Sequence, residues 1–186
     1  VDTLLVEDVP VFTPAEADAA LRFVTLVDMC YESRPRMVVF RPAQPNGAAV
    51  LITPGGGYRW VVVDKEGYEM GRWLAARGYT VFVLFYRLPG EGWAAGPDVG
   101  LSDAQRAMRL IRSRAATYGI DPARVGAMGF SAGGHLCADL ATRFDVKTYE
   151  PVDDADALAA LTSAVQDVHP SDDSAWRQVR RGWIVR

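Results

Sequence analysis

The chain has few of the residues that build metal centres, redox centres and disulfide frameworks. Its 186 residues include only two cysteines and two histidines. The cysteines, Cys30 and Cys137, are far apart and form no C-x-x-C pair, so the sequence indicates neither a zinc site nor a redox dithiol. We expect two buried thiols, no metal and no cofactor.

Long apolar runs and a strong excess of one charge are also missing. No stretch of about 18 apolar residues occurs, which argues against a membrane span. The first ten residues contain acids and no basic segment before an apolar stretch, unlike a signal peptide. The net charge of −3 favours neither nucleic acid nor an anionic membrane as a partner. We therefore expect a cytoplasmic protein.

Apolar runs that suit strands alternate with helical patterns between residues 37 and 143. The expected strands are nearly continuous apolar runs and cover residues 37–40, 48–53, 80–86 and 124–128. The expected helices cover residues 65–77, about 102–116 (capped by Ser102 or Asp103) and 131–143. This alternation predicts an α/β fold with a mostly parallel sheet and helices on both faces. Glu66 and Asp103 are expected to be capping or helix-surface acids.

The alternation stops after residue 146. Residues 150–173 hold seven acids and no lysine or arginine, whereas residues 174–186 hold four arginines and no acid. Only residues 158–168 are apolar enough for a further element. We expect one domain over residues 1–186, with a recognisable core at about 36–145 and an irregular or divergent tail over 150–186.

A G-x-S-x-G motif, Gly129-Phe130-Ser131-Ala132-Gly133, lies between an expected strand and an expected helix. In such a turn the strand and helix backbones come close, so the flanking glycines are required, and the serine hydroxyl stands clear of the sheet. The N–H group of Ala132 and the helix N-terminus then face a developing negative charge. The motif predicts that Ser131 is a nucleophile; a glycine-rich turn without chemistry is the alternative.

Three glycines follow an earlier strand, in Pro54-Gly55-Gly56-Gly57-Tyr58. Glycines allow backbone N–H groups to turn toward a bound oxyanion. A flexible turn and a phosphate loop are the alternatives. The dinucleotide fingerprint fails because Trp60 stands where it needs glycine, and no Gly-Lys-Ser/Thr follows. We favour an oxyanion loop, and Tyr58 either lines a substrate pocket or is a structural aromatic residue.

Residues 36–143 resemble the esterase branch of the α/β-hydrolases that includes acetylxylan esterase-like proteins and related carboxylesterases. The matching segments are PGGGY at 54–58, GYTVFVLFYR at 78–87, GIDP at 119–122 and GFSAGGH at 129–135. The resemblance implies a serine hydrolase that cleaves short-chain esters, such as acetyl or sugar esters, through an acyl-enzyme on Ser131. It implies an oxyanion hole made by Gly56, Gly57 and Ala132, and a small-molecule ester as the partner.

A serine nucleophile needs a histidine base and an orienting carboxylate, which follow the serine in that fold in the order acid, then histidine. His135 lies on the helix that begins at the motif, so we expect it to pack or hydrogen-bond. His169 is the remaining candidate base, and the candidate acids between it and Ser131 are Asp153, Asp154, Asp156 and Asp167. However, the family places its acid and histidine after further strands, and only 43 residues follow Arg143. A surface loop position is the alternative for His169.

These observations lead us to expect a family member that is shortened at its C-terminus, by truncation or by a frame change. A non-catalytic hydrolase-fold protein that lacks the acid and the histidine is therefore the alternative function. The strand at residues 124–128 would lie at or near the edge of the sheet. An exposed apolar edge favours self-association.

Overall fold

A mostly parallel sheet forms the centre of the protein. The computed structural model describes residues 5–7, 35–157 and 182–185. Its strands are β1 (Leu5–Glu7), β2 (Arg36–Phe40), β3 (Ala49–Thr53), β4 (Thr80–Phe85), β5 (Val125–Phe130) and β6 (Gly182–Val185). They lie in the order β1-β2-β4-β3-β5-β6. Strand β3 pairs in parallel with β4 and β5, and β1 pairs in parallel with β2. The β2–β4 and β5–β6 pairs are antiparallel.

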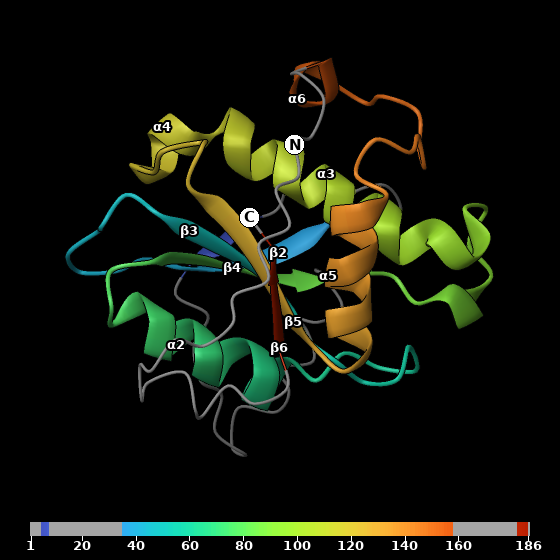
Figure 1. Ribbon diagram of the computed structural model, residues 1–186, viewed down its shortest axis with the longest axis horizontal. Helices are drawn as coiled ribbons and strands as arrows, with labels where there is room; N and C mark the ends of the chain where they lie inside the picture. Colours follow the sequence, from blue (N-terminus) through green and yellow to red (C-terminus); the bar gives the residue numbers. More distant parts are fainter. Residues whose placement is uncertain (1–4, 8–34, 158–181, 186) are drawn as a thin grey trace.

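Helices cover both faces of this sheet, as the sequence predicts (Figure 1). The π-helical segment η2 (Val63–Glu69) continues into α2 (Met70–Ala75) on one face. Helices α3 (Val99–Ser113), α4 (Ala115–Tyr118) and α5 (Ala132–Thr142) cover the other face. Two short 3₁₀ turns, η3 (Pro89–Glu91) and η4 (Gly96–Asp98), lead from β4 into α3, and α6 (Asp154–Ala157) packs on α3.

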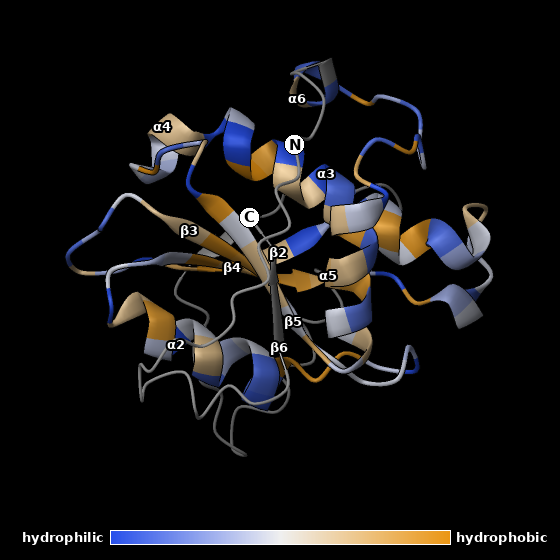
Figure 2. Cartoon of the chain, viewed as in Figure 1, coloured by the Kyte–Doolittle hydropathy of each residue, from blue (hydrophilic) through white to orange (hydrophobic). Residues whose placement is uncertain are grey.

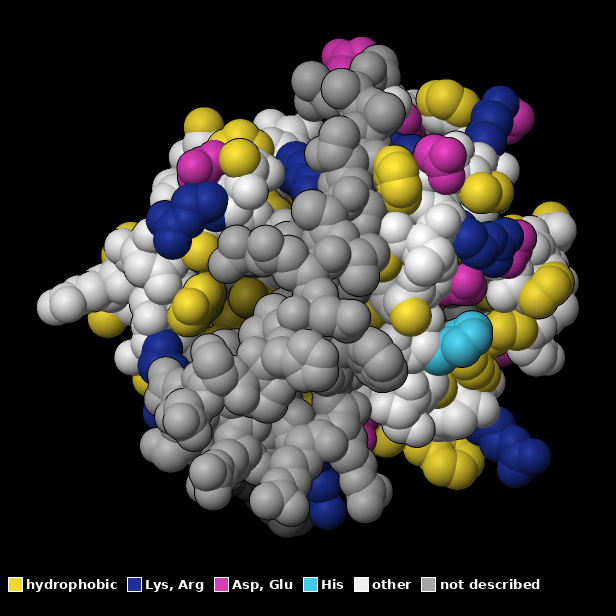
Figure 3. Space-filling model, viewed as in Figure 1, with side chains coloured by type: hydrophobic (Ala, Val, Ile, Leu, Met, Phe, Trp, Pro, Cys, Tyr) yellow, Lys and Arg dark blue, Asp and Glu magenta, His cyan; other side chains and the backbone are white. Residues whose placement is uncertain are grey.

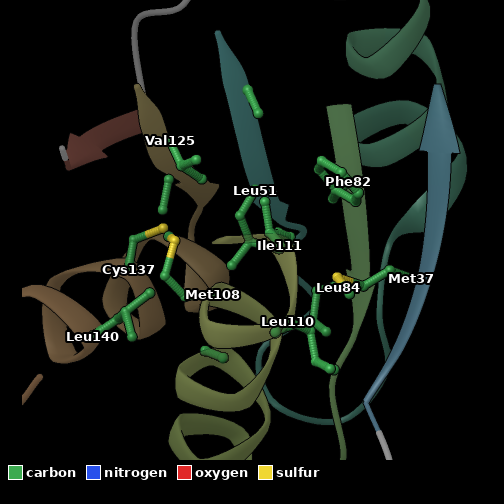
Figure 4. Packing of buried hydrophobic residues seen from close by; sticks show 14 of the residues in the cluster. Met37, Leu51, Phe82, Leu84, Met108, Leu110, Ile111, Val125, Cys137 and Leu140 are labelled. Atoms are coloured by element: carbon green, nitrogen blue, oxygen red, sulfur yellow. The ribbon is translucent and has the colours of Figure 1, made fainter. Parts of the chain in front are cut away.

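The central strands bury side chains on both faces, which explains their nearly continuous apolar sequence. The register pairs Leu51 with Phe82 and Ile52 with Val83. The first pair belongs to the core cluster against α3 and α5, and the second to the cluster against α2. All four side chains are fully buried. Figure 4 shows the larger cluster, and Figure 2 shows the apolar colouring concentrated in the sheet.

The prediction that Ser102 or Asp103 caps the long helix is wrong. Helix α3 begins at Val99, with Asp98 at its N-cap, and both predicted caps lie buried inside the helix. The Ser102 hydroxyl lies 3.0 Å from the Asp98 carbonyl oxygen, one helical turn back. Asp103 accepts hydrogen bonds from Arg87, including one of 2.7 Å from its guanidinium. Ser102 and Asp103 are of residue types that are common at caps, but here they form their hydrogen bonds with partners that the local sequence does not indicate.

The strand expected at or near the sheet edge, at residues 124–128, is β5, and it is the last strand but one. Strand β6 pairs with β5, with Phe130 opposite Gly182, so both edges of β5 are occupied. The four residues of β6 fall in the segment expected to be irregular, too short to show a periodic pattern. Self-association through a sheet edge stays a prediction, which now concerns the outer strands β1 and β6. The element expected at 158–168 and Cys30 lie outside the described residues.

Charged side chains of both signs are interspersed over the described part of the face in Figure 3. Several of them form ion pairs, such as Arg143 with Asp98 at 2.9 Å. None of the helices in the described ranges is long and apolar enough to cross a membrane.

Helix α6 is attached to α3 by the buried Arg106 guanidinium, which contacts Asp153 at 2.5 Å and Asp156 at 2.8 Å. The hydrogen bond from Arg106 lowers the pKa of Asp153 to about 2. The ordinary pKa of an unfolded aspartate is about 4, so this pair stabilises the fold above that pH, and the stabilisation is lost as pH falls toward 2.

We expect the unfolding free energy of Asp153→Asn to fall less than that of the wild type between pH 6 and pH 2.5, measured by urea titration. The exposed Asp154→Asn is the control and should behave as the wild type. Equal pH dependence in Asp153→Asn and the wild type would contradict this assignment.

Candidate active site

The chain passes from β5 into α5 through a strained turn at Ser131. This residue has φ 50° and ψ −118° and is the N-cap of α5. A backbone of this kind costs a non-glycine residue roughly 1–3 kcal/mol, and it persists only where the surroundings impose it. Ser131 is exposed beside the N-terminus of α5. The strand–turn–helix context expected for the motif is therefore present.

The two motif glycines allow the close approach that imposes this turn. A Cβ atom at Gly129 would lie 2.2 Å from the Gly133 carbonyl oxygen. A Cβ atom at Gly133 would lie 1.9 Å from the Thr53 carbonyl oxygen and 2.5 Å from that of Pro54. The first turn of α5 thus packs directly on the end of β3, with no room for a side chain.

Thr53, the last residue of β3, joins this strand to the first turn of α5. Its buried Oγ1 lies 2.8 Å from the Gly133 carbonyl oxygen and 3.1 Å from the Cys137 Sγ. Burial raises the pKa of the Cys137 thiol to about 12, so it stays protonated, in agreement with the predicted buried thiol. We did not single out Thr53 from the sequence; the available signal was a polar residue that ends an apolar strand directly before the glycine loop.

The glycine loop lies against this turn. A Cβ atom at Gly55 would lie 3.1 Å from the Ser131 Cβ. Gly56 and Gly57 have φ values of 133° and 63°, which glycine adopts readily. The Gly56 carbonyl oxygen accepts the Arg59 N–H at 3.1 Å. The N–H groups of Gly56 and Gly57 donate no hydrogen bond to any other described residue.

Glu66 and Tyr86 support the loop from outside, a role that the sequence predicted for neither residue. Glu66 accepts the Gly55 N–H at 2.6 Å. This contact replaces the capping or helix-surface role expected for Glu66. The Tyr86 hydroxyl, directly after β4, donates to the Pro54 carbonyl oxygen at 2.6 Å and is fully buried.

Tyr58 and His135 form a pair beside the loop. The Tyr58 hydroxyl lies 2.8 Å from the His135 Nδ1, and the rings meet edge to face. Burial, followed by the charge of Asp139, raises the pKa of Tyr58 to about 12, so its hydroxyl is neutral at neutral pH. His135 thus has the hydrogen-bonding role that its place on α5 predicts. The substrate-pocket role of Tyr58 stays a prediction.

No described residue acts as an acid or a base toward Ser131. His169, the candidate base, and Asp167 lie outside the described ranges. Two other candidate acids, Asp153 and Asp156, contact Arg106. Their helix α6 lies far from the end of β5 (Figure 1). Within the described residues, the Ser131 hydroxyl has no hydrogen-bond partner, and no group of three His, Cys, Asp or Glu side chains suits a metal.

Comparison with known proteins agrees with the resemblance seen in the sequence. The family model BD-FAE matches residues 37–173. An acetylxylan esterase of Xylanibacter ruminicola is 35% identical over 127 residues, which is 68% of this chain and 25% of that protein. An ethyl acetate hydrolase of Pseudomonas putida is 33% identical over 111 residues, 56% of this chain and 33% of that protein.

Solved structures are similar as well. The acetyl ester-xyloside bifunctional hydrolase of Caldicellulosiruptor lactoaceticus has a TM-score of 0.56 and 31% identity, over 80% of this chain and 47% of that one. A thermophilic esterase of Thermogutta terrifontis has a TM-score of 0.52 and 26% identity, over 60% of this chain and 41% of that one. The chain thus spans a quarter to a third of these two sequence relatives and less than half of these two solved chains. It belongs to the BD-FAE family, among the esterases of the α/β-hydrolase superfamily.

Proposed function

We propose that this protein is a serine hydrolase that cleaves short-chain carboxylic esters, of the acetyl-ester or sugar-ester type, through an acyl-enzyme on Ser131. One observation carries the proposal: the exposed Ser131 stands on a strained turn against a loop whose Gly56 and Gly57 N–H groups donate to no other described residue. The names of the acetylxylan esterase and ethyl acetate hydrolase relatives support the acyl class.

In this mechanism the Ser131 Oγ attacks the ester carbonyl carbon while a histidine takes the hydroxyl proton; His169 is the candidate. The carbonyl oxygen becomes an oxyanion that accepts hydrogen bonds from the N–H groups of Ala132, Gly56 and Gly57. Each such donor contributes roughly 3–4 kcal/mol to the transition state. The alcohol leaves with the proton, and water then hydrolyses the acyl-serine by the same steps. The Tyr58 ring lines the pocket for the substrate.

The experiment that tests this mechanism is a burst assay with p-nitrophenyl acetate. We expect a rapid release of p-nitrophenol equal to the protein concentration, followed by slower turnover, because acylation precedes hydrolysis. Mass spectrometry of the quenched protein should place the acetyl group on Ser131. A fluorophosphonate should label the same residue. A folded protein that gives neither burst nor label would contradict the proposal.

The alternative is a non-catalytic hydrolase-fold protein that serves in binding or association. The observation in its favour is that no described residue hydrogen-bonds to the Ser131 hydroxyl, while Asp153 and Asp156 are held by Arg106. Without a base the hydroxyl is a poor nucleophile. This alternative predicts a folded protein whose Ser131 is not labelled by a fluorophosphonate.

A further inference from the structure

A single peptide group of the glycine loop, the one between Pro54 and Gly55, is hydrogen-bonded at both of its ends. Its carbonyl oxygen accepts the Tyr86 hydroxyl proton at 2.6 Å. Its N–H donates to the Glu66 Oε2, also at 2.6 Å. Because a peptide group is planar, two bonds on opposite sides prevent it from rotating about the chain axis. The next N–H groups along the chain are those of Gly56 and Gly57.

The two peptide groups that carry the Gly56 and Gly57 N–H groups are held at their carbonyl ends. The Gly55 carbonyl oxygen accepts the Val62 N–H at 2.9 Å, and the Gly56 carbonyl oxygen accepts the Arg59 N–H at 3.1 Å. The N–H groups themselves donate to no other described residue, and glycine allows many backbone angles, so their direction also depends on the peptide group that precedes them. An oxyanion hole stabilises a transition state because its donors are oriented in advance. The Pro54–Gly55 peptide group, one residue earlier in the chain, is fixed by Glu66 of η2 on one side and by Tyr86 after β4 on the other, and it adds to that orientation.

We call Glu66, Tyr86 and the Pro54–Gly55 peptide group that they hold the clamp. The clamp lies directly beside Ser131. A Cβ atom at Gly55 would lie 2.8 Å from the Glu66 Oε2 and 3.1 Å from the Ser131 Cβ, so the carboxylate and the serine flank the same residue. The clamp also decides which amides are available. Glu66 occupies the Gly55 N–H, which leaves those of Gly56 and Gly57 for a ligand.

Both partners suit this task. A carboxylate forms shorter and stronger hydrogen bonds with N–H groups than a neutral acceptor does. Burial raises the pKa of Tyr86, so its hydroxyl stays protonated and able to donate. Its ring also meets the Tyr58 ring edge to face, which holds the other end of the loop.

We propose that Glu66 and Tyr86 are positioning residues that clamp the Pro54–Gly55 peptide group and thereby orient the Gly56 and Gly57 N–H groups toward an oxyanion. The catalytic part of this inference rests on the proposed function. The orientation of the amides does not, and it is measurable in a protein without turnover.

The kinetic test compares Glu66→Ala, Glu66→Gln and Tyr86→Phe on p-nitrophenyl acetate. A misplaced oxyanion donor costs about 100-fold in rate, so we expect Glu66→Ala to lower kcat about 100-fold with KM within about threefold. Glu66→Gln keeps an acceptor oxygen, so its kcat should be close to that of the wild type. The kcat of Tyr86→Phe should lie between those of Glu66→Ala and Glu66→Gln.

Two controls separate positioning from general loss of structure. Glu69 is exposed on the same segment as Glu66, so Glu69→Ala should leave kcat unchanged. Tyr149 is a half-buried tyrosine whose hydroxyl bonds to Asp156, on α6. Tyr149→Phe should therefore lower stability without lowering kcat.

The amide test uses NMR. In Glu66→Ala and Tyr86→Phe the Gly55, Gly56 and Gly57 N–H resonances should shift and exchange faster with solvent, while resonances of the core strands stay in place. Unchanged Gly56 and Gly57 amides would overturn the clamp whatever the kinetics. A Glu66→Ala kcat equal to that of Glu69→Ala would overturn its catalytic part. If the wild type shows no burst and no label, the proposed function fails, and the amide test alone decides the clamp.

Discussion

Replacing Gly133 with alanine is expected to leave little or no folded protein. The added Cβ would lie 1.9 Å from the Thr53 carbonyl oxygen and 2.5 Å from the Pro54 carbonyl oxygen. Both contacts are with backbone atoms, so no side-chain rotation relieves them. Helix α5 would have to move away from β3, which would break the hydrogen bond from Thr53 to the Gly133 carbonyl and open the core at Leu136 and Cys137. We expect the free energy of unfolding to fall by more than about 4 kcal/mol, in the range that marks severe core defects.

The measurement is soluble yield, followed by urea unfolding if enough protein is obtained. Gly100→Ala is the matched control, because Gly100 is also a buried helical glycine near a backbone carbonyl. Its added Cβ would lie 3.6 Å from the Arg87 carbonyl oxygen, an ordinary contact. Alanine favours a helix over glycine by up to about 1 kcal/mol, so this variant should be as stable as the wild type or more so. A Gly133→Ala protein as stable as Gly100→Ala would show that the close packing of α5 on β3 is wrong.

The sequence predicted those parts of the fold whose physical cause shows in neighbouring residues. The run over residues 80–86 is apolar because β4 is buried on both faces, and Gly78, with φ 89°, closes the turn that follows the end of α2 at Ala75. The start of α3 was not readable, because Ser102 and Asp103 have the chemistry of caps while their partners lie in η4 and at Arg87. Strand β6 was missed because its partner, β5, is more than 50 residues away in the sequence.

The candidate site divides in the same way. The turn at Ser131 and the glycine loop are each contained in five consecutive residues, so their spacing alone predicted them. The residues that hold these segments in place come from other elements. Thr53, Glu66 and Tyr86 act through contacts that only the folded chain creates. In the sequence, a threonine at the end of a strand or a glutamate before a helix looks the same whether it supports a neighbouring loop or lies on the surface.

Ser131→Ala is expected to abolish the burst, the acyl adduct and the fluorophosphonate label, and to lower turnover of p-nitrophenyl acetate by roughly 10⁴-fold or more. The variant removes only the attacking oxygen. The N–H groups of Gly56, Gly57 and Ala132 remain, so substrate affinity should change little. The assay needs wild-type and variant proteins prepared in parallel, so that a contaminating esterase is recognised by its equal rate in both. Turnover that is unchanged in a folded Ser131→Ala protein would exclude Ser131 as the nucleophile.

Ser131→Gly separates the chemistry of this residue from its backbone. Both variants lack the hydroxyl, so both should be inactive. They differ at φ 50°, where an alanine is strained and a glycine is not. We therefore expect Ser131→Gly to exceed Ser131→Ala in unfolding free energy by about 1 kcal/mol, after the greater chain entropy of glycine is included. Such a gain would mean that the wild type keeps a destabilising serine at this turn, as a site selected for reactivity does. Equal stability of the two variants would show that the turn is not strained, and that the exposed position of Ser131 has another cause.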